Sequence, residues 1–244
     1  MWASLGHMPV IVLLRHGIST ANTAGILAGR TPGVSLTEQG VSALENTLRM
    51  LPQRSFTRLI HSPLLRCEQT ARIAAGVVEA ETIEASPDLL ELDYGEWSGR
   101  SLEELRREDD WRLVLEQASR FRFPGGESIA EAADRSVRRV RSVVEGLRAA
   151  ERERPRSPQA ERGAPLWALL VTHGDIIKAV VADALGLPLD DFQRLSVAPG
   201  SFSVIDFGAA HPVLTALSVT SAGIAEAAEP GGGGLRTRAD TPPG

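Results

Sequence analysis

The stretch VIVLLRHG, residues 10–17, joins a short apolar run to a polar turn. Its first five residues are continuous and begin with β-branched side chains, a pattern typical of a strand buried on both faces of a parallel sheet. His16 then lies at the carboxyl end of that strand, where open α/β sheets form their ligand crevice. Arg15 supplies positive charge beside it, and Gly17 lets the backbone approach a ligand closely. The stretch therefore predicts an α/β fold with a candidate oxyanion site at this edge, the alternative being that His16 is a hydrogen-bonded surface residue.

A second unit repeats this layout late in the chain. Residues 166–172 form the clearest buried strand in the sequence, and the pair His173 and Gly174 follows it directly. Asp175 is expected to cap a helix that runs through Leu185 and is terminated by Gly186 and Pro188. Two histidines are thus predicted at the carboxyl ends of two buried strands.

Arg66 has an unusual place for a basic residue. Ser62 is a good N-cap and Pro63 a good first helical residue, so a helix is expected from there to about Glu79. Arg66 then falls in the first turn, where its charge opposes the helix dipole. Because an anion bound at that helix N-terminus would resolve the conflict, a functional role for Arg66 is favoured.

The remaining elements follow from hydrophobic spacing and capping residues. We expect a loop over 18–36, a helix capped by Thr37 and stopped by Pro52, strands at 58–61 and 81–86, helices from Ser101 and over 109–120, a long helix opened by the Ser128–Glu131 capping box with its arginines facing water, a linker at 151–165, and strands at 201–207 and 213–219. A loop of that length is usually functional or disordered, so 18–36 is expected to lie over the end of the first strand.

Composition limits the class of protein. The chain has 244 residues, 43% hydrophobic and 23% charged, which fits one domain with a sizeable core. A net charge of -5 argues against a nucleic-acid partner, because binding to the phosphate backbone needs a clustered positive surface. The single cysteine, Cys67, excludes a disulfide framework and a cysteine-based zinc site, and is expected to be buried and structural.

The ends of the chain differ in composition from its centre. Residues 1–8 are interpreted as an N-terminal extension, either a cloning remnant or native, residues 9–220 as the functional domain, and residues 221–244 as a disordered tail rich in Gly and Pro. The sequence contains no apolar stretch near the about 18 residues of a membrane span, and its start lacks the regions of a secretory signal. We therefore expect a cytoplasmic protein with no membrane partner.

Residues 89–99, LLELDYGEWSG, gather acidic and aromatic side chains in one short loop, called the acid loop below. Their composition leaves three candidates for a general acid, namely Glu91, Asp93 and Glu96. Trp97 is expected to pack beneath this loop rather than to contact a substrate.

Five motifs in order make the chain similar to the histidine phosphatase superfamily, the phosphoglycerate-mutase-like proteins. They are Arg15-His16-Gly17 with Ser19 and Asn22, Ser62-Pro63-Leu64-Leu65-Arg66, Leu90-Glu91 followed by Gly95-Glu96-Trp97-Ser98-Gly99, Pro124-Gly125-Gly126-Glu127-Ser128, and Thr172-His173-Gly174. The resemblance covers residues 9–207 and implies a three-layer sandwich, with a mostly parallel central sheet flanked by helices. Residues 19–33 most resemble an actinobacterial branch whose members are often named mutases, whereas Ile18 departs from the Glu that many relatives carry there.

The chemistry of a phosphate monoester fits these motifs. Such an ester is a dianion that repels nucleophiles, so its pocket needs fixed positive charge and a nucleophile that is neutral at about pH 7. Arg15 and Arg66 would hold the phosphate oxygens, and their charge persists at any working pH. His16 would attack phosphorus to form a phosphohistidine.

The remaining roles come from the family pattern. His173 would donate hydrogen bonds to the transition-state oxygens, and Glu91 is selected as the general acid. Asn22 and Gly174 complete the implied phosphate pocket. The resemblance implies no metal and no cofactor. A structural role is favoured for His61. For Glu127 and Ser128 two alternatives stay open, namely that they approach the site or that they serve the start of the long helix, which Ser128 is suited to cap.

The leading functional hypothesis is a phosphatase acting on a small phosphorylated metabolite, and the alternative is a cofactor-dependent phosphoglycerate mutase. The mutases of this family carry a longer, basic insertion after the acid loop, whereas here only residues 101–123 stand there, which favours hydrolysis. A non-catalytic phosphate-binding protein is a third hypothesis. The sequence leaves the substrate open, and a homodimer is compatible with it.

Overall fold

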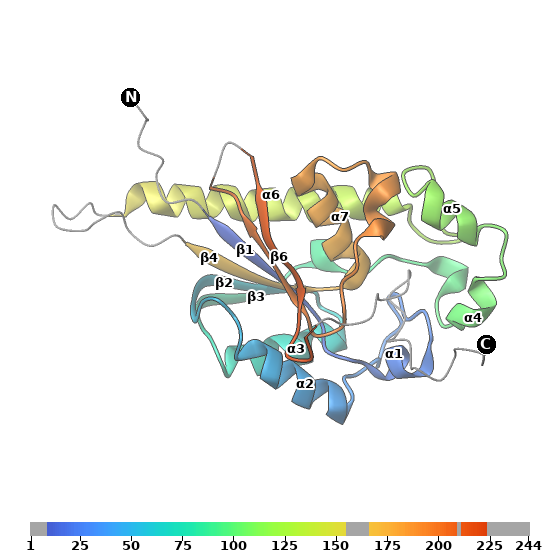
Figure 1. The fold of residues 1–244 in the computed structure, drawn as a ribbon, viewed down its shortest axis with the longest axis horizontal. Helices are drawn as coiled ribbons and strands as arrows, with labels where there is room; N and C mark the ends of the chain where they lie inside the picture. The colour runs from blue at the N-terminus through green and yellow to red at the C-terminus, as the bar shows by residue number, and fades with distance from the viewer. Residues whose placement is uncertain (1–8, 155–165, 209–210, 224–244) are drawn as a thin grey trace.

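The computed structural model describes residues 9–154, 166–208 and 211–223, and a single six-stranded sheet lies at its centre (Figure 1). The strands are β1 (Val10–Arg15), β2 (Ser55–His61), β3 (Glu79–Ala85), β4 (Trp167–Thr172), β5 (Phe202–Asp206) and β6 (Val213–Val219). They lie in the order β3-β2-β4-β1-β5-β6, with β3, β2, β4 and β1 mutually parallel. β5 runs antiparallel to β1, and β6 antiparallel to β5. The prediction of a mostly parallel sheet is confirmed.

Helices cover both faces of the sheet. The α-helices are α1 (Thr20–Ala24), α2 (Glu38–Leu48), α3 (Leu65–Ala75), α4 (Leu102–Leu105), α5 (Trp111–Glu116), α6 (Ile129–Glu153) and α7 (Gly174–Leu185), and short 3-10 helices cover Pro87–Leu89, Gly95–Trp97 and Leu189–Arg194. Two helices, α2 and α3, lie on one side of the sheet, and the long α6 lies with α7 on the other (Figure 1). The three-layer sandwich is confirmed.

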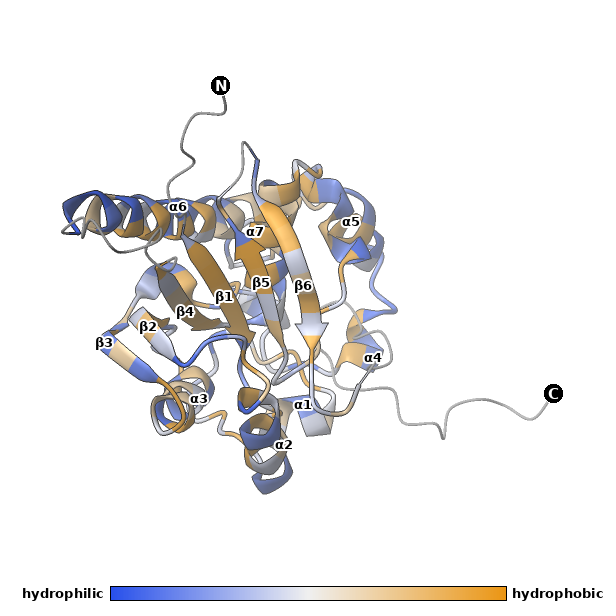
Figure 2. Cartoon of the chain, turned by 60° about the vertical axis from the view of Figure 1, so that its left-hand side comes forward, coloured by the Kyte–Doolittle hydropathy of each residue, from blue (hydrophilic) through white to orange (hydrophobic). Residues whose placement is uncertain are grey.

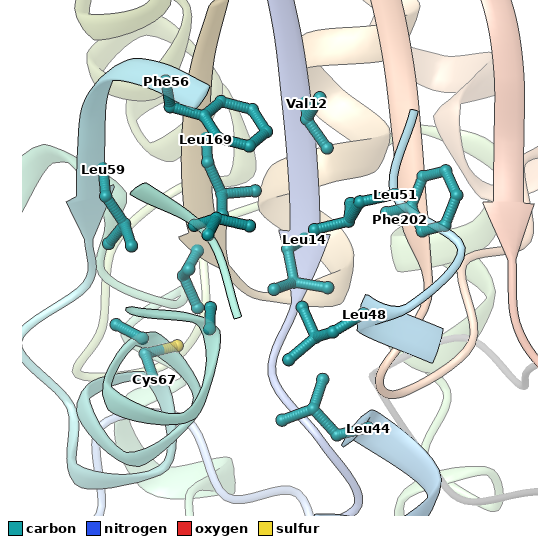
Figure 3. Packing of buried hydrophobic residues seen from close by; sticks show 14 of the residues in the cluster. Val12, Leu14, Leu44, Leu48, Leu51, Phe56, Leu59, Cys67, Leu169 and Phe202 are labelled. Carbon is teal, nitrogen blue, oxygen red and sulfur yellow. The ribbon is translucent and has the colours of Figure 1, made fainter. Parts of the chain in front are cut away.

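Alternation along β1 builds the two cores. Val12 and Leu14 face α2 and α3, while Ile11 and Leu13 face α6 and α7, and all four are fully buried. Figure 2 shows β1, β4 and β5 as largely hydrophobic strands between the helices, and Figure 3 shows the first of these cores. Burial on both faces explains why the strand has no polar residue before Arg15.

A third apolar cluster supports the acid loop from outside the sheet. Trp97 stacks on Trp111 with ring centroids 6.1 Å apart, and Phe123 packs edge-on against Trp97 at 5.3 Å. Both tryptophans are buried, and α4 and α5 lie in the same cluster at one end of the molecule (Figure 1). Trp97 therefore packs beneath the acid loop, as predicted.

Several helix starts differ from the predictions because a cap residue has another partner. The expected loop 18–36 contains α1, which Ser19 and Asn22 open with a reciprocal capping box. The N-cap of α3 is the apolar Leu64 and not Ser62, whose Oγ accepts from the Leu64 N–H at 3.4 Å and from His173 Nε2 at 2.8 Å. Likewise α7 begins after His173, while the side chain of Asp175 accepts from the Tyr94 hydroxyl at 3.0 Å.

Other boundaries shift by a few residues. α3 ends at Ala75 rather than at Glu79, because Glu79 already begins β3. β2 begins at Ser55, three residues before its predicted start at Arg58, and α5 is shorter than its predicted 109–120. Thr37 caps α2 as predicted, and the Ser128–Glu131 capping box opens α6.

The prediction that the arginines of the long helix face water is wrong for two of them. Arg135 is only 14% exposed at its side chain, and Arg139 only 19%, because each reaches back to the chain beneath α6. Arg139 pairs with Glu84 on β3 at 2.6 Å, and Arg135 reaches the acid loop.

Some predicted segments lie outside the described residues, namely the extension 1–8, the linker from 155 to 165 and the tail from residue 224. Residues 151–153 of the predicted linker belong to α6. Residues 221–223 of the predicted tail are ordered into a turn, where the Ser221 backbone N–H donates to Thr47 Oγ1 at 3.2 Å. Within the described part of the chain, no helix has the length and apolar character needed to cross a membrane.

Candidate active site

The carboxyl ends of β1, β2 and β4 meet at one edge of the sheet. Arg15 pairs with Thr172 and His61 with Val171, so the residues that follow these strands converge. The rings of His16 and His173 lie with centroids 5.3 Å apart. The two strand-His-Gly units therefore form one site, to which α3 adds Arg66 in its first turn.

His16 is buried and held in one tautomer. Its Nδ1 lies 2.8 Å from the Gly17 carbonyl oxygen, which can only accept, so Nδ1 carries the proton and Nε2 keeps its lone pair. Burial, followed by the charges of Arg66 and Arg15, holds the pKa of His16 well below its usual range. The imidazole is therefore uncharged at neutral pH and keeps the Nε2 lone pair.

His173 is fully buried between a cation and a hydroxyl. Arg66 Nη2 donates to its Nδ1 at 3.1 Å, so its Nε2 carries the proton and donates to Ser62 Oγ at 2.8 Å. Burial, followed by the charge of Arg66, holds the pKa of His173 well below its usual range. In this arrangement His173 orients the Arg66 guanidinium.

Cys67 packs directly against His173. Its Sγ lies 3.4 Å from His173 Nε2, and the side chain is fully buried in the core between α3 and the sheet (Figure 3). Burial raises the pKa of the Cys67 thiol to about 12. The thiol is thus a neutral packing group, as predicted.

Each arginine of the site is anchored by a backbone carbonyl. Arg15 Nη1 donates to Val197 O at 2.6 Å, and Arg66 Nη2 donates to Gly29 O at 2.8 Å. A Cβ atom at Gly174 would lie 3.1 Å from Arg15 Cζ, so the absence of a side chain at Gly174 lets this guanidinium lie against the start of α7. Both cations are therefore fixed before any ligand arrives.

These groups surround a small pocket of about 20 Å³, the room of one water molecule. Its lining consists of Arg15, His16, Ser19, Asn22, Ile26, Ala28, Gly29, Arg66, Glu91 and Tyr94. Among the described residues, His173 and Gly174 stand behind this lining. A larger hollow of about 760 Å³ between α6, α7 and Phe207 contains none of the predicted site residues.

Glu91 is the acidic residue that reaches the pocket from the acid loop. Its Oε2 lies 4.0 Å from His173 Nδ1, and its Oε1 accepts from the Leu92 N–H at 3.0 Å. Burial, followed by the nearby Asp175, raises the pKa of Glu91 to about 7, with Arg66 opposing the rise. A carboxyl group with this pKa can both give and take a proton near neutral pH.

The other two acidic candidates stand away from the pocket. Asp93 is 43% exposed at its side chain and accepts from the Gly95 N–H at 3.1 Å. The Glu96 side chain lies against Gly125, in the turn before α6. Geometry therefore separates Glu91 from Asp93 and Glu96, which composition could not.

The remaining candidates have local partners. Asn22 lines the pocket, although its Oδ1 already accepts from the Ser19 N–H at 3.0 Å. His61 Nδ1 donates to the Ser62 carbonyl at 2.9 Å, outside the lining that the described residues form. Ser128 caps α6, and Glu127 binds Arg30 and Arg135.

Sequence reasoning missed several polar partners of the site. The Tyr94 hydroxyl donates to Asp175 Oδ2, and Asp175 Oδ1 accepts from Lys178 Nζ at 3.1 Å, so a buried cation balances this carboxylate. Arg30 and Arg135 reach the main chain of Glu91. No sequence signal marked Arg30 or Arg135 as a partner of Glu91, which lies 61 and 44 residues away along the chain. In the described part of the chain, no cluster of three or more His, Cys, Asp or Glu side chains is placed to hold a metal ion.

The fold, with two histidines and two arginines gathered at this edge of the sheet, matches what the sequence motifs implied, and the comparison with family models agrees. A model described as histidine phosphatase superfamily (branch 1) matches residues 11–220. The chain belongs to the histidine phosphatase superfamily, which confirms the resemblance seen in its motifs.

Individual relatives carry two kinds of name. The protein called "Probable phosphoglycerate mutase GpmB" from Photorhabdus laumondii is 34% identical over 203 residues, covering 81% of this chain and 84% of that protein. Among solved structures, the alpha-ribazole phosphatase from Shigella flexneri matches with a TM-score of 0.69 and 22% identity, over 86% of this chain and 96% of that one. The mycobacterial glucosyl-3-phosphoglycerate phosphatase matches with a TM-score of 0.69 and 23% identity, over 86% and 98%. At these identities the two structures support the fold.

Proposed function

We propose that this protein hydrolyses small-molecule phosphate monoesters through a phosphohistidine formed on His16. The observation that carries the proposal is the pocket itself, where an uncharged imidazole stands between two anchored guanidinium groups. Buried fixed cations stabilise a phosphate dianion and the charge of its transition state. Glu91, with its pKa of about 7, supplies the proton that the leaving group needs.

The reaction has two steps in this proposal. Arg15 and Arg66 bind the phosphate oxygens, and His16 Nε2 attacks phosphorus while the bond to the ester oxygen breaks and Glu91 protonates that oxygen. A water molecule then attacks the phosphohistidine, Glu91 takes its proton, and the bond from phosphorus to Nε2 breaks. Inorganic phosphate leaves and His16 returns to its starting state.

His173 acts differently before and after the phosphate binds. Before binding, it is neutral and accepts a hydrogen bond from Arg66. A dianion in the pocket favours the protonated imidazole, since an opposite charge nearby raises the pKa of a histidine. His173 then donates to a phosphate oxygen and adds positive charge in the transition state.

A phosphoglycerate mutase is the second candidate, favoured by the name of the GpmB relative. A mutase must shield its phosphohistidine from water and rebind a reaction intermediate. Between the acid loop and the turn before α6, this chain carries the short helices α4 and α5, whose apolar residues pack into the third cluster. This compact segment favours hydrolysis.

The test is a screen of phosphate esters with purified protein, run with and without 2,3-bisphosphoglycerate. We expect release of inorganic phosphate from several esters without that addition. Interconversion of phosphoglycerates that requires 2,3-bisphosphoglycerate, without phosphate release, would identify a mutase instead.

Replacement of Glu91 should separate esters by their leaving groups. Glu91→Gln is expected to slow release of an alkyl alcohol by about 100-fold or more, and release of p-nitrophenolate by less than about tenfold, because an alkoxide needs a proton and p-nitrophenolate does not. The measurement is the pre-steady-state burst of leaving group, so that hydrolysis of the phosphohistidine does not limit the rate. Equal slowing of both esters would contradict a proton-donor role for Glu91.

The pH dependence provides an internal control for the same variant. Donation requires the protonated carboxyl group, so the alkyl-ester rate of the wild-type protein should fall as the pH rises through the Glu91 pKa of about 7. The Glu91→Gln variant should lack this fall. On the acidic side, the rate of the wild-type protein should fall only at a pH well below the usual histidine pKa, because the pKa of His16 is lowered.

A further inference from the structure

We propose that Arg30, Arg135 and Glu127 form a clamp on the main chain of Glu91 that positions its carboxyl group in the pocket. This inference rests on the proposed function, in which Glu91 moves the proton. Arg30, Arg135 and Glu127 are then positioning residues and not catalytic ones. They act through Glu91 and stand outside the pocket lining that the described residues form.

The first part of the clamp is a pair of cationic donors on one carbonyl. Arg30 Nε donates to Glu91 O at 3.0 Å, and Arg135 Nη2 donates to the same oxygen at 3.1 Å. Arg135 Nη1 also donates to Asp88 O at 2.8 Å, directly before the acid loop. Hydrogen bonds from a charged donor are roughly twice as strong as neutral ones, so the backbone at Glu91 is fixed from both sides.

The second part is one carboxylate oxygen that joins both arginines. Glu127 Oε1 accepts from Arg30 Nη2, from Arg135 Nη2 and from the Asp93 N–H, each at 2.9 Å. The side chains of Glu127 and Arg135 are only 15% and 14% exposed. Such a network is held more firmly than an isolated surface ion pair.

The third part is close backbone packing that brings Glu127 to the acid loop. A Cβ atom at Gly126 would lie 2.2 Å from Asp93 O, and one at Gly95 would lie 2.1 Å from Pro124 O. The turn before α6 and the acid loop are therefore interlocked. The clamp ties together the segment after α1, the acid loop, this turn and α6.

The clamp keeps the Glu91 carboxyl group away from water. The charged and titratable groups that interact with that carboxyl group are Arg15 from β1, Arg66 and Cys67 from α3, His173 and Asp175 around the start of α7, and Tyr94 from the acid loop. A looser acid loop leaves the groups on β1, on α3 and around the start of α7 in place but lets solvent reach the carboxyl group. The pKa of Glu91 should then fall from about 7 toward its ordinary value of 4.5.

The experiment compares Arg135→Met with Arg139→Met. Both remove a partly buried arginine of α6, but Arg139 pairs with Glu84 on β3 and does not touch the acid loop. Carbon-13 NMR titration of labelled glutamate, assigned with Glu91→Gln, measures the Glu91 pKa directly. The ratio of alkyl-ester to p-nitrophenyl-ester turnover measures its use as an acid.

We expect Arg135→Met to lower the Glu91 pKa by about one pH unit or more. It should also lower the ratio of alkyl-ester to p-nitrophenyl-ester turnover by about tenfold, while Arg139→Met changes neither quantity. Glu127→Gln, which keeps the shape of the side chain, should produce a smaller change in the same direction. An unchanged Glu91 pKa in a folded Arg135→Met or Glu127→Gln protein would overturn the clamp. A wild-type protein that hydrolyses no ester would overturn the proposed function, whereas the titration would still decide the clamp.

Discussion

His16→Ala should abolish phosphate release, with turnover falling by at least about 1,000-fold, because no other described side chain stands in the pocket as a neutral nitrogen nucleophile. The variant should also fail to retain label when quenched after mixing with a radiolabelled phosphate ester. The wild-type protein should retain acid-labile label under the same conditions. A variant with more than about a tenth of wild-type turnover would exclude the covalent route.

His61→Ala is the matched control for this experiment. His61 also ends a sheet strand near the site, but it bonds to the Ser62 carbonyl and is only half-buried. We expect its turnover to stay within about threefold of wild type, because its Nδ1 bonds to a main-chain carbonyl and its side chain lies outside the pocket lining that the described residues form.

Arg66→Lys should reduce kcat/KM by about 100-fold or more although the charge is kept. A lysine ammonium has three donors on one nitrogen, so with donors to Gly29 O and His173 Nδ1 it keeps only one for phosphate and lacks the second arm of the guanidinium. Initial-rate kinetics on p-nitrophenyl phosphate measure the loss, since that ester depends least on Glu91.

Arg72→Lys on the same helix provides the comparison. Arg72 is exposed and pairs with Glu68, so its replacement should leave kcat/KM within about twofold. Near-normal kinetics for Arg66→Lys would mean that a point charge suffices at position 66. That result would contradict bidentate binding of the phosphate by the Arg66 guanidinium.

The parts of the fold that could be predicted were those set by continuous patterns. The apolar runs before His16 and His173 predict buried parallel strands, and parallel strands bring their carboxyl ends to one edge. Arg66 was identified because its place in a first helical turn conflicts with the helix dipole. Residue type alone could not distinguish Glu91 from Asp93 as the candidate acid. The two differ in burial, which raises the pKa of Glu91, and burial follows from the tertiary structure.

The parts that could not be predicted depend on partners far along the chain. Ser62 and Asp175 are good N-caps by residue type, but their side chains also bond to His173 and Tyr94, and neither residue is the N-cap of its helix. Local preference does not include such competition. The short helix α1 was missed because its capping box uses Asn22 in place of the usual Glu or Gln.

The contact between Cys67 and His173 makes the chain carry its own reporter of local opening. Cys67 is the one cysteine in the sequence, its side chain is fully buried, and its thiol is protonated at neutral pH because its pKa is about 12. A thiol reagent can reach it only after α3 separates from the end of β4. The labelling rate of the unmodified protein, relative to that of the unfolded chain, therefore gives the free energy of opening the contact between Cys67 and His173 without any introduced probe.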